Sequence, residues 1–321
     1  MGAKKVEEAN LEEWLLTGEP WVVYRVLTDL VGKDDEDPKV ALARAALYNH
    51  PLVRTYIEKI SKEGNRATKE VIDTVWPRIE ADFWVLPVLA DFGLTVMDSR
   101  IAKACERLFS KQLDSGRFGL DLPLKLGNCL TAIITETLAK LGLLNDPRLH
   151  KAYEYILGKQ RATGGFCFKD SGHTEYTEEA EPTSPSVSTF ALGALAQDPD
   201  LRDSDHAKKG VDFLFQCWTN KGKNRNKNGV SKIWRDWGKL KYPFTEYRIL
   251  KFLDILSQFN HATKRLRDLE IIDELIKKQD AKGRFTPESV MRAWSDFDFG
   301  HKEKPSRWIT FLAMRIAKRI L

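Results

Sequence analysis

The chain has 321 residues, of which 42% are hydrophobic and 30% are charged, and its formal net charge is +5. This balance is typical of a soluble globular protein, and the modest charge gives no strong signal for nucleic-acid binding. No apolar run approaches the roughly 20 residues of a membrane span, so no transmembrane segment is expected.

Cysteine usage and the start of the chain bear on the compartment. The four cysteines include no CxxC pair, which fits thiols in a reducing compartment better than disulfides. The polar, acidic N-terminus is no secretory signal. We therefore expect a cytoplasmic protein. The densest basic stretch, residues 221–227, lies among Asn and Gly; this indicates a solvated loop, and no nucleic-acid partner is expected.

Helical periodicity runs through the whole chain, and strand-like alternation is nearly absent. Short amphipathic helices are predicted at 10–17, 20–32, 37–48 and 50–62. A longer series is predicted at 78–92, 99–112, 126–142, 147–160, 185–197, 205–217, 244–258, 265–279 and 305–320. Gly, Pro, Asn and Asp separate these segments, as expected at helix ends. The predicted fold class is all-α.

One turn pattern, Gln-x-x-x-Gly-x-Phe, occurs three times, each time at the end of a predicted helix. The copies span 112–118, 160–166 and 279–285, and residues 216–220 are a degraded copy that ends in Asn. The Gly is expected to adopt a positive φ at the helix C-terminus. The Gln amide can tie that helix end to the start of the next helix, and the Phe packs back on the helix just ended.

Each turn is preceded by a charged helix and followed by a more apolar one. The apolar members are 128–141, 186–196, 244–259 and 308–320, and 78–92 fits the same set. This alternation is what two concentric rings require: outer helices have one wet face, whereas inner helices contact both the outer ring and a central cavity.

The pattern Q-x-x-x-G-x-[WF] resembles the α/α-toroid repeat of the squalene-cyclase and protein-prenyltransferase superfamily, and GNCLTAIITETLAKLG resembles an inner-helix segment of that superfamily. The resemblance covers about residues 76–320. The segments PWVVYRVLTDLVG and GRFTPESV…FDFG…PSRW are similar to those of a prokaryotic group of toroid proteins, for which the resemblance implies no activity. The fold is weak evidence for function.

The resemblance implies a toroid of about five to six helical hairpins at 76–321, with N-terminal helices at 1–75 that pack on it or complete it. The family's functional motifs are missing. The D-x-D-D acid motif is reduced to D-x-D at 296–298, and the zinc set of Asp, Cys and His has no counterpart. The acidic run 34–37 resembles a diphosphate–magnesium motif only superficially and is expected to be a solvated loop.

The long loop between 166 and 186 is the first candidate site. Cys167, Asp170 and His173 are side chains of types that bind zinc, although their spacing matches no known zinc module. The alternative is an acidic lid in solvent. No cofactor is firmly implied; zinc here and magnesium at 34–37 are the two candidates.

The stretch that leads into the last helix is a second candidate. Asp296 or Asp298 would act as an acid and Arg307 as an anion clamp. Trp294 and Trp308 would bind ligand. The alternative is a structural closure of the ring, in which the two tryptophans pack and the charges satisfy one another.

A third group of aromatic side chains precedes the predicted helix 244–258 and extends into it. Trp237, Tyr242, Phe244 and Tyr247 would line the mouth of a cavity. Such walls suit isoprenoid tails and stabilise cations. They also suit sugar stacking or a plain core.

The starts of inner helices are a further place to search. Trp76 with Asp82, and Asn128 with Cys129, begin two of them. Trp76 and Asn128 are candidate ligand contacts, and Asp82 is a candidate acid. Cys129 is expected to be a buried structural thiol. Asp82 or Glu136 facing an apolar cavity would have a raised pKa.

Three functions compete. The first is a cyclase- or prenyltransferase-like toroid that binds or transforms a hydrophobic, isoprenoid-like small molecule in a central cavity. The second is a non-catalytic scaffold or interaction protein whose ring is filled by side chains. The third is a carbohydrate-active enzyme with an α/α barrel, which needs two carboxylates about 5–10 Å apart across a groove. Whether the chain is an enzyme stays open.

Overall fold

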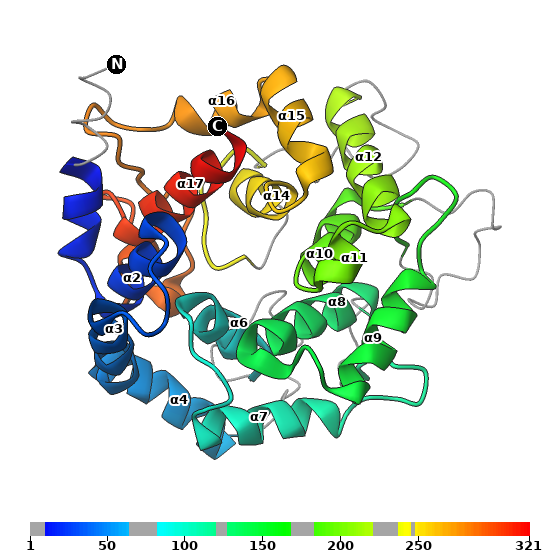
Figure 1. The fold of residues 1–321 in the computed structure, drawn as a ribbon, viewed down its shortest axis with the longest axis horizontal. Coiled ribbons are helices and arrows are strands. Elements are labelled where there is room, and N and C mark those ends of the chain that lie inside the picture. Colours follow the sequence, from blue (N-terminus) through cyan, green and yellow to red (C-terminus); the bar gives the residue numbers. More distant parts are fainter. Residues whose placement is uncertain (1–9, 64–81, 120–126, 168–182, 221–236, 245–247) are drawn as a thin grey trace.

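A computed structural model describes residues 10–63, 82–119, 127–167, 183–220, 237–244 and 248–321 (Figure 1). In these ranges the regular structure is helical, with no β-strand and only isolated bridges. The all-α prediction is therefore confirmed. Residues 10–16, the first helical segment described, precede the first labelled helix.

Six of the described helices contact one another in a closed cycle. In chain order each contacts the next, and the last contacts the first. The six are α2 (Pro20–Arg25), α6 (Asp82–Phe92), α8 (Gly127–Leu138), α10 (Pro185–Leu195), α14 (Ile249–Leu256) and α17 (Arg307–Ile320). Figure 1 shows α17, in red, lying beside α2, in blue. The contact between α2 and α17, which lie far apart in the sequence, closes the cycle.

The remaining longer helices pack on the outside of this cycle (Figure 1). They are α3 (Pro38–Asn49), α4 (Pro51–Glu63), α7 (Ser99–Phe109), α9 (Pro147–Leu157), α12 (Asp205–Thr219), α15 (Asn260–Asp268) and α16 (Ile271–Ile276). Burial separates the two sets: every residue of α14 is buried, whereas only Ala262 and Leu266 are buried in α15. Five members of the cycle, α6, α8, α10, α14 and α17, correspond to the helices that the sequence marked as apolar, whereas α2 falls among the expected N-terminal helices.

Short elements complete the chain. Two π-helical turns, η1 (Val26–Val31) and η2 (Ala139–Leu143), extend α2 and α8. The four-residue helix α11 (Pro199–Arg202) precedes α12, and two 3₁₀ turns, η4 (Arg292–Trp294) and η5 (Asp298–Gly300), precede α17.

The repeated turn has the predicted backbone. Gly116, Gly164 and Gly283 have φ angles of 84°, 86° and 73°, which other residues rarely adopt. A Cβ on Gly116 would lie 2.0 Å from the carbonyl oxygen of Lys151 in α9. The turn after α7 therefore packs directly on the next outer helix.

The glutamine of the turn fixes the same contact. Gln112 Nε2 donates to the carbonyl oxygens of Gly116 (3.1 Å) and of Arg148 (2.8 Å), which lies in the first turn of α9. Gln160 Nε2 donates in the same way to Gly164 and, at 2.8 Å, to His206 in the first turn of α12. The amide thus joins successive outer helices, not the inner helix that follows directly in sequence.

The phenylalanine of the turn is held by the inner helix. The backbone N–H groups of the three phenylalanines donate to hydroxyl oxygens: Phe118 to Thr131 (3.2 Å), Phe166 to Ser188 (2.9 Å) and Phe285 to Thr310 (3.0 Å). Each hydroxyl lies in the helix that follows its turn. The repeat therefore includes a Ser or Thr that the sequence pattern did not reveal.

Two predicted helices differ in their bounds. The single helix expected at 265–279 is two helices, α15 and α16, because Glu270 adopts a left-handed conformation with φ 51°. The helix expected from 244 is described only from Ile249, and Arg248 before it is extended. In both cases the apolar periodicity continues past the residue where the helical backbone is interrupted, Glu270 or Arg248. Neither residue is Gly or Pro, so the sequence did not indicate the interruption.

Candidate functional site

A pocket lies among α6, α8, α10 and α14, four members of the closed cycle. Its volume open to the centre of a water molecule is about 30 Å³, enough for roughly two or three waters. The lining residues are Trp84, Pro87, Val88, Asp91, Ile133, Glu136, Thr137, Lys140, Phe190, Tyr242, Pro243, Phe244 and Lys251.

The pocket has two kinds of wall. Trp84, Val88 and Ile133 give an aliphatic and aromatic surface, which Phe190 and Phe244 extend. The other wall consists of the charged side chains Asp91, Glu136, Lys140 and Lys251. A molecule with an apolar body and a polar end would meet a matching surface at each end.

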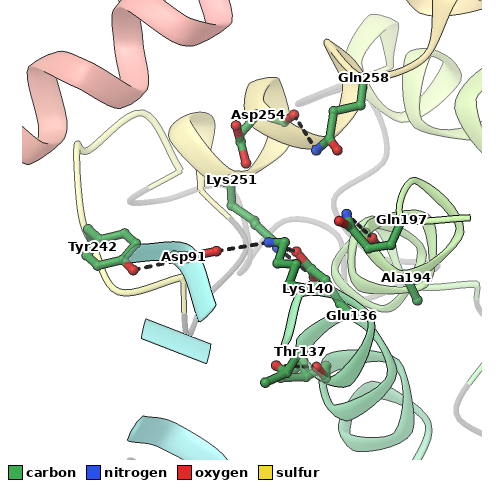
Figure 2. Close-up of polar contacts among 12 residues, drawn as sticks. Asp91, Glu136, Thr137, Lys140, Ala194, Gln197, Tyr242, Lys251, Asp254 and Gln258 are labelled. Atoms are coloured by element: carbon green, nitrogen blue, oxygen red, sulfur yellow. Dashed lines mark hydrogen bonds and ion pairs between the residues drawn. The ribbon is translucent and has the colours of Figure 1, made fainter. Parts of the chain in front are cut away.

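Glu136 is the centre of the charged wall. Its Oε1 lies 2.6 Å from Lys140 Nζ, and both of its carboxylate oxygens lie 2.8 Å from Lys251 Nζ. Lys140 Nζ also donates to Asp91 Oδ1 at 2.9 Å, and the hydroxyl of Tyr242 donates to Asp91 Oδ2 at 3.0 Å. Figure 2 shows Lys140 and Lys251 reaching Glu136 from two different helices.

Helix geometry explains how these groups meet. Glu136 and Lys140 are four residues apart, so they lie on the same face where α8 runs into η2. Gly193 of α10 makes room for the carboxylate, because a Cβ there would lie 2.5 Å from Glu136 Oε2. Lys251 comes from α14, and its side chain is only 4% exposed.

A second carboxylate group joins α14, α17 and η1. Asp254 Oδ1 lies 2.8 Å from Arg315 and 3.2 Å from Arg319. Arg315 also reaches Asp29 Oδ2 at 3.1 Å, and Arg25 lies 2.8 Å from the same oxygen. Charged side chains of this group therefore tie three members of the closed cycle, α2, α14 and α17, to one another.

Burial and charge act in opposite directions on Glu136. Burial raises the pKa of Glu136, but the ammonium groups of Lys140 and Lys251 lower it by more, and the net pKa lies below its usual value. The raised pKa expected for this carboxyl from an apolar cavity is therefore wrong, since sequence did not reveal the two lysines beside it. Glu136 is a carboxylate at neutral pH and not a proton donor.

Lys140 and Tyr242 are held in their protonated forms at neutral pH. Burial lowers the pKa of Lys140, but Asp91 and Glu136 outweigh burial and raise it above its usual value. Burial, assisted by the charge of Asp91, raises the pKa of Tyr242 well above its usual value. At neutral pH the wall thus presents ammonium and phenol donors beside two carboxylates that accept from them.

Two of the aromatic residues selected from sequence line this pocket. Tyr242 is fully buried and Phe244 is partly exposed; their rings lie 5.1 Å apart. The ring of Phe244 also lies 5.2 Å from Lys251 Nζ. Trp237 does not line the pocket: it is buried against Trp218, with ring centroids 4.8 Å apart.

Trp294 and Trp308 are buried in a packed aromatic cluster outside the pocket lining. Trp294 stacks on Tyr56 with ring centroids 5.2 Å apart. Trp308 lies edge-on to Phe92 at 4.9 Å and to Tyr242 at 5.6 Å. Trp308 therefore backs the pocket through Tyr242, without reaching it.

The two candidate acids near the C-terminus lie outside the pocket lining. Asp298 Oδ2 accepts from the backbone N–H of Trp308 at 3.2 Å, at the start of α17, and burial raises the pKa of Asp298. Asp296 is exposed. The burial of Tyr56, and after it the charge of Asp296, raises the pKa of Tyr56 to about 12.

Arg307 holds the N-terminal segment. Its Nε donates to the carbonyl oxygen of Trp14 at 3.1 Å, and its guanidinium lies 4.7 Å from the centre of the Trp14 ring. The side chain expected to clamp an anion thus contacts residue 14 outside the pocket.

Several candidate residues fall outside the described part of the chain. Trp76, Tyr247, Asp170 and His173 lie outside the described residues. Asp82 and Asn128 stand in the first turns of α6 and α8, but their side chains are outside the description too. Of the proposed zinc set, Cys167 is the one member that the structure describes, and it is buried.

Metal ligation has no further support within the described residues, where no group of three His, Cys, Asp or Glu side chains is placed to hold a metal ion. In the acidic run 34–37, Asp37 caps α3 by accepting from the backbone N–H of Lys39 at 2.8 Å.

Comparisons with known proteins give no family assignment. No protein-family model matches the sequence, and no curated protein matches it either. Within the residues that the structure describes, no helix has the length and apolar character needed to cross a membrane.

Sequence reasoning missed three of the four charged residues of the pocket. Of Asp91, Glu136, Lys140 and Lys251, only Glu136 was selected. The available signal was a charged residue within an apolar helix: Lys251 and Asp254 interrupt ILKFLDIL, whose eight residues are all buried. Fully buried charges are rare unless they are paired, so such positions predict partners on neighbouring helices.

Proposed function

We propose that this chain is an α/α toroid of the squalene-cyclase and prenyltransferase type that binds a hydrophobic, isoprenoid-like small molecule at its centre, in the cytoplasm. The observation that carries the proposal is the pocket between α6, α8, α10 and α14, where an aromatic and aliphatic wall faces buried charges. The closed contact cycle of six helices supports the toroid.

The wall chemistry suits an unsaturated hydrocarbon. The aromatic rings of Trp84, Phe190 and Phe244 offer flat apolar surfaces to a branched, unsaturated chain. The pocket volume of about 30 Å³ admits only one end of such a molecule. Trp84 and Phe244 are partly exposed, so they are the side chains that would turn outward when the body of the ligand enters.

The first experiment is extraction of the purified protein with organic solvent, followed by mass spectrometry. The second is a calorimetric titration with geraniol, a C10 isoprenoid alcohol, using Ile133→Trp to fill the pocket. Leu42→Trp, at a side chain that is 73% exposed on α3, is the matched control. Wild type and the control should bind geraniol, and Ile133→Trp should lose binding. Equal binding by all three would place the site elsewhere, and no binding by wild type together with empty extracts would overturn the proposal.

A non-catalytic scaffold is the second candidate function. The small pocket volume and the mutual pairing of Asp91, Glu136, Lys140 and Lys251 favour it, since both leave little space at the centre of the cycle. A scaffold would bind no isoprenoid, so the titration separates the two candidates.

A further inference from the structure

The charged groups that line the pocket balance one another. Two ammonium groups and two carboxylates line it among the described residues: Lys140, Lys251, Asp91 and Glu136. Lys140 Nζ lies 2.9 Å from Asp91 Oδ1 and 2.6 Å from Glu136 Oε1, and Lys251 Nζ lies 2.8 Å from the latter oxygen. The phenol of Tyr242 is uncharged at neutral pH, because burial and the charge of Asp91 raise its pKa well above the usual value. The described lining therefore carries no net charge.

The neighbouring arginine group does not alter this balance. It holds three guanidinium groups and two carboxylates: Arg25, Arg315, Arg319, Asp29 and Asp254. None of the five is among the residues that line the pocket. The side chains of Arg25 and Arg319 are 25% and 31% exposed, so water and salt screen the extra positive charge of this group.

The lining groups keep both donors and acceptors for a ligand. An ammonium group carries three N–H donors, and a carboxylate offers about four lone pairs. Lys140 donates two hydrogen bonds, to Asp91 Oδ1 and to Glu136 Oε1. Asp91 accepts two, from Lys140 and from the hydroxyl of Tyr242. Counting partners among the described residues, one donor of Lys140 and about two lone pairs of Asp91 remain.

We infer that the ligand of the pocket ends in an uncharged hydroxyl group, which accepts a hydrogen bond from Lys140 and donates one to Asp91. The inference rests on the proposed function and names the polar end of the same ligand, whose apolar body lies against Trp84, Phe190 and Phe244. A hydroxyl both donates and accepts, so it matches the remaining capacity of both side chains. It leaves the charge balance of the lining unchanged, and the volume of about 30 Å³ has room for so small a group.

Other polar ends fit less well. A carboxylate or a phosphate would add negative charge beside the two carboxylates, and an amine would add positive charge beside the two lysines. Burying a charge without an opposite partner is costly. A carbonyl or an ether is uncharged but only accepts, so it would give Asp91 no donor.

Three ligands with the same C10 body test the polar end: geraniol, geranic acid and geranylamine, each titrated into the full chain by calorimetry at neutral pH. At this pH the acid is a carboxylate and the amine is an ammonium. Geraniol should bind at least about tenfold more tightly than either, because each of the others adds an unpaired charge to a balanced site. Equal affinities, or tighter binding of the acid or the amine, would overturn the inference and leave the proposed function standing. If none of the three binds, the proposed function itself fails.

A substitution that unbalances the lining provides a second test. Asp91→Asn leaves two ammonium groups against one carboxylate, so the affinity of geranic acid relative to geraniol should rise at least about tenfold. Asp205→Asn, at a side chain that is 85% exposed on α12, removes the same charge outside the pocket and should keep the wild-type ratio. A folded Asp91→Asn variant with the wild-type ratio would contradict the inference. If this variant does not fold, the three titrations of the wild type decide alone.

Discussion

Burial alone raises the pKa of a carboxyl group. In Glu136 two neighbouring ammonium groups counteract this effect. Its side chain is 6% exposed, yet two ammonium groups lie within 2.8 Å of its oxygens. Replacing Glu136 would remove the ion-pair partner of the buried Lys251, and removal of one partner of a comparable buried pair costs about 3–5 kcal/mol. The carboxylate of Glu136 is therefore expected to contribute to stability through Lys251.

Gly193 is predicted to be required for this arrangement. In Gly193→Ala the new methyl group would lie 2.5 Å from Glu136 Oε2, so the free energy of unfolding should fall by about 1–3 kcal/mol, as for other overpacked cores. Gly158→Ala is the control, since φ there is −64° and the nearest atom is 3.4 Å away. Urea unfolding of both variants measures the difference. Similar stability of the two would show that α10 can shift away from the carboxylate.

Stability should depend on the charge of Asp254 at low pH. Burial raises the pKa of Asp254, but Arg315 and Arg319 lower it by more, far below the ordinary 3.8. The unfolded chain therefore takes up a proton near pH 4 that the native chain does not, and stability is lost as the pH falls below that value.

The matching variant is Asp254→Asn, which lacks the titrating group. Wild type should be more stable than Asp254→Asn at pH 7, and the difference should shrink as the pH falls from about 4 to 2. Urea unfolding at successive pH values gives this difference directly. Asp205→Asn, at an exposed side chain, should follow wild type throughout. A difference that does not change with pH would mean that the carboxylate charge is not what stabilises the protein.

Among the elements, the repeated turn was predictable in part. The pattern Gln-x-x-x-Gly-x-Phe indicated the positive φ of Gly116 and a tie by the Gln112 amide, because both follow from local chemistry. It did not indicate that the amide reaches Arg148, or that Thr131 accepts from the phenylalanine N–H. Those partners depend on how helices pack, which a local pattern does not contain.

Two separate features are expected to require glycine in a turn: a positive φ angle and the close approach of another helix. Gly32 and Gly116 both have positive φ, but a Cβ on Gly32 would contact nothing within 4 Å, whereas one on Gly116 would lie 2.0 Å from Lys151 O. Gly32→Ala should therefore cost only about 1–2 kcal/mol of conformational strain. Gly116→Ala should cost more than about 3 kcal/mol, because α9 must move as well. Thermal or urea unfolding checks the ranking, and equal losses would argue that close packing of the turn on α9 adds nothing.

Two threonines of α8 can test how much the hydroxyl that accepts from the turn N–H contributes to stability. Thr131 and Thr135 are both fully buried in α8. Thr131→Val leaves the N–H of Phe118 without its acceptor and should cost about 1–3 kcal/mol. Among the described residues, Thr135 hydrogen-bonds to a carbonyl of its own helix and to no turn, so Thr135→Val should cost clearly less. Exchange of the Phe118 amide hydrogen should also quicken in Thr131→Val alone. Unchanged exchange of this amide would show that the hydroxyl of Thr131 is not part of the repeated turn motif.

At the scale of the whole molecule, sequence predicted the all-α class, and which helices are the more apolar ones, better than it predicted the pocket. Apolar periodicity sums over many residues, so it survives local irregularities such as the break at Glu270. The pocket depends on a few charged residues that meet from α6, α8 and α14. Lys251 was not selected because its partner Glu136 is 115 residues away, and no local pattern joins the two.

The closure between the chain ends leads to the last prediction. Asp29 of η1 binds Arg25 and Arg315, and Lys318 donates to the carbonyl oxygens of Asp29 and Leu30. If these contacts close the cycle, Asp29→Asn should weaken both ends together, although the ends are far apart in sequence. Hydrogen exchange should quicken in α2 and in α17, and the free energy of unfolding should fall by about 3 kcal/mol, as when one partner of a buried pair is removed.

Asp35→Asn is the control for this closure. The side chain of Asp35 is 68% exposed and forms an ion pair with Arg44. An exposed ion pair of this kind contributes about 0–1 kcal/mol. Its exchange in α2 and α17 should match wild type. Faster exchange in α2 alone in Asp29→Asn would show that the N-terminal helices open independently of α17. Faster exchange at both ends would show that the chain termini hold one cooperative unit, in which the pocket between α6, α8, α10 and α14 depends on contacts made at the far ends of the sequence.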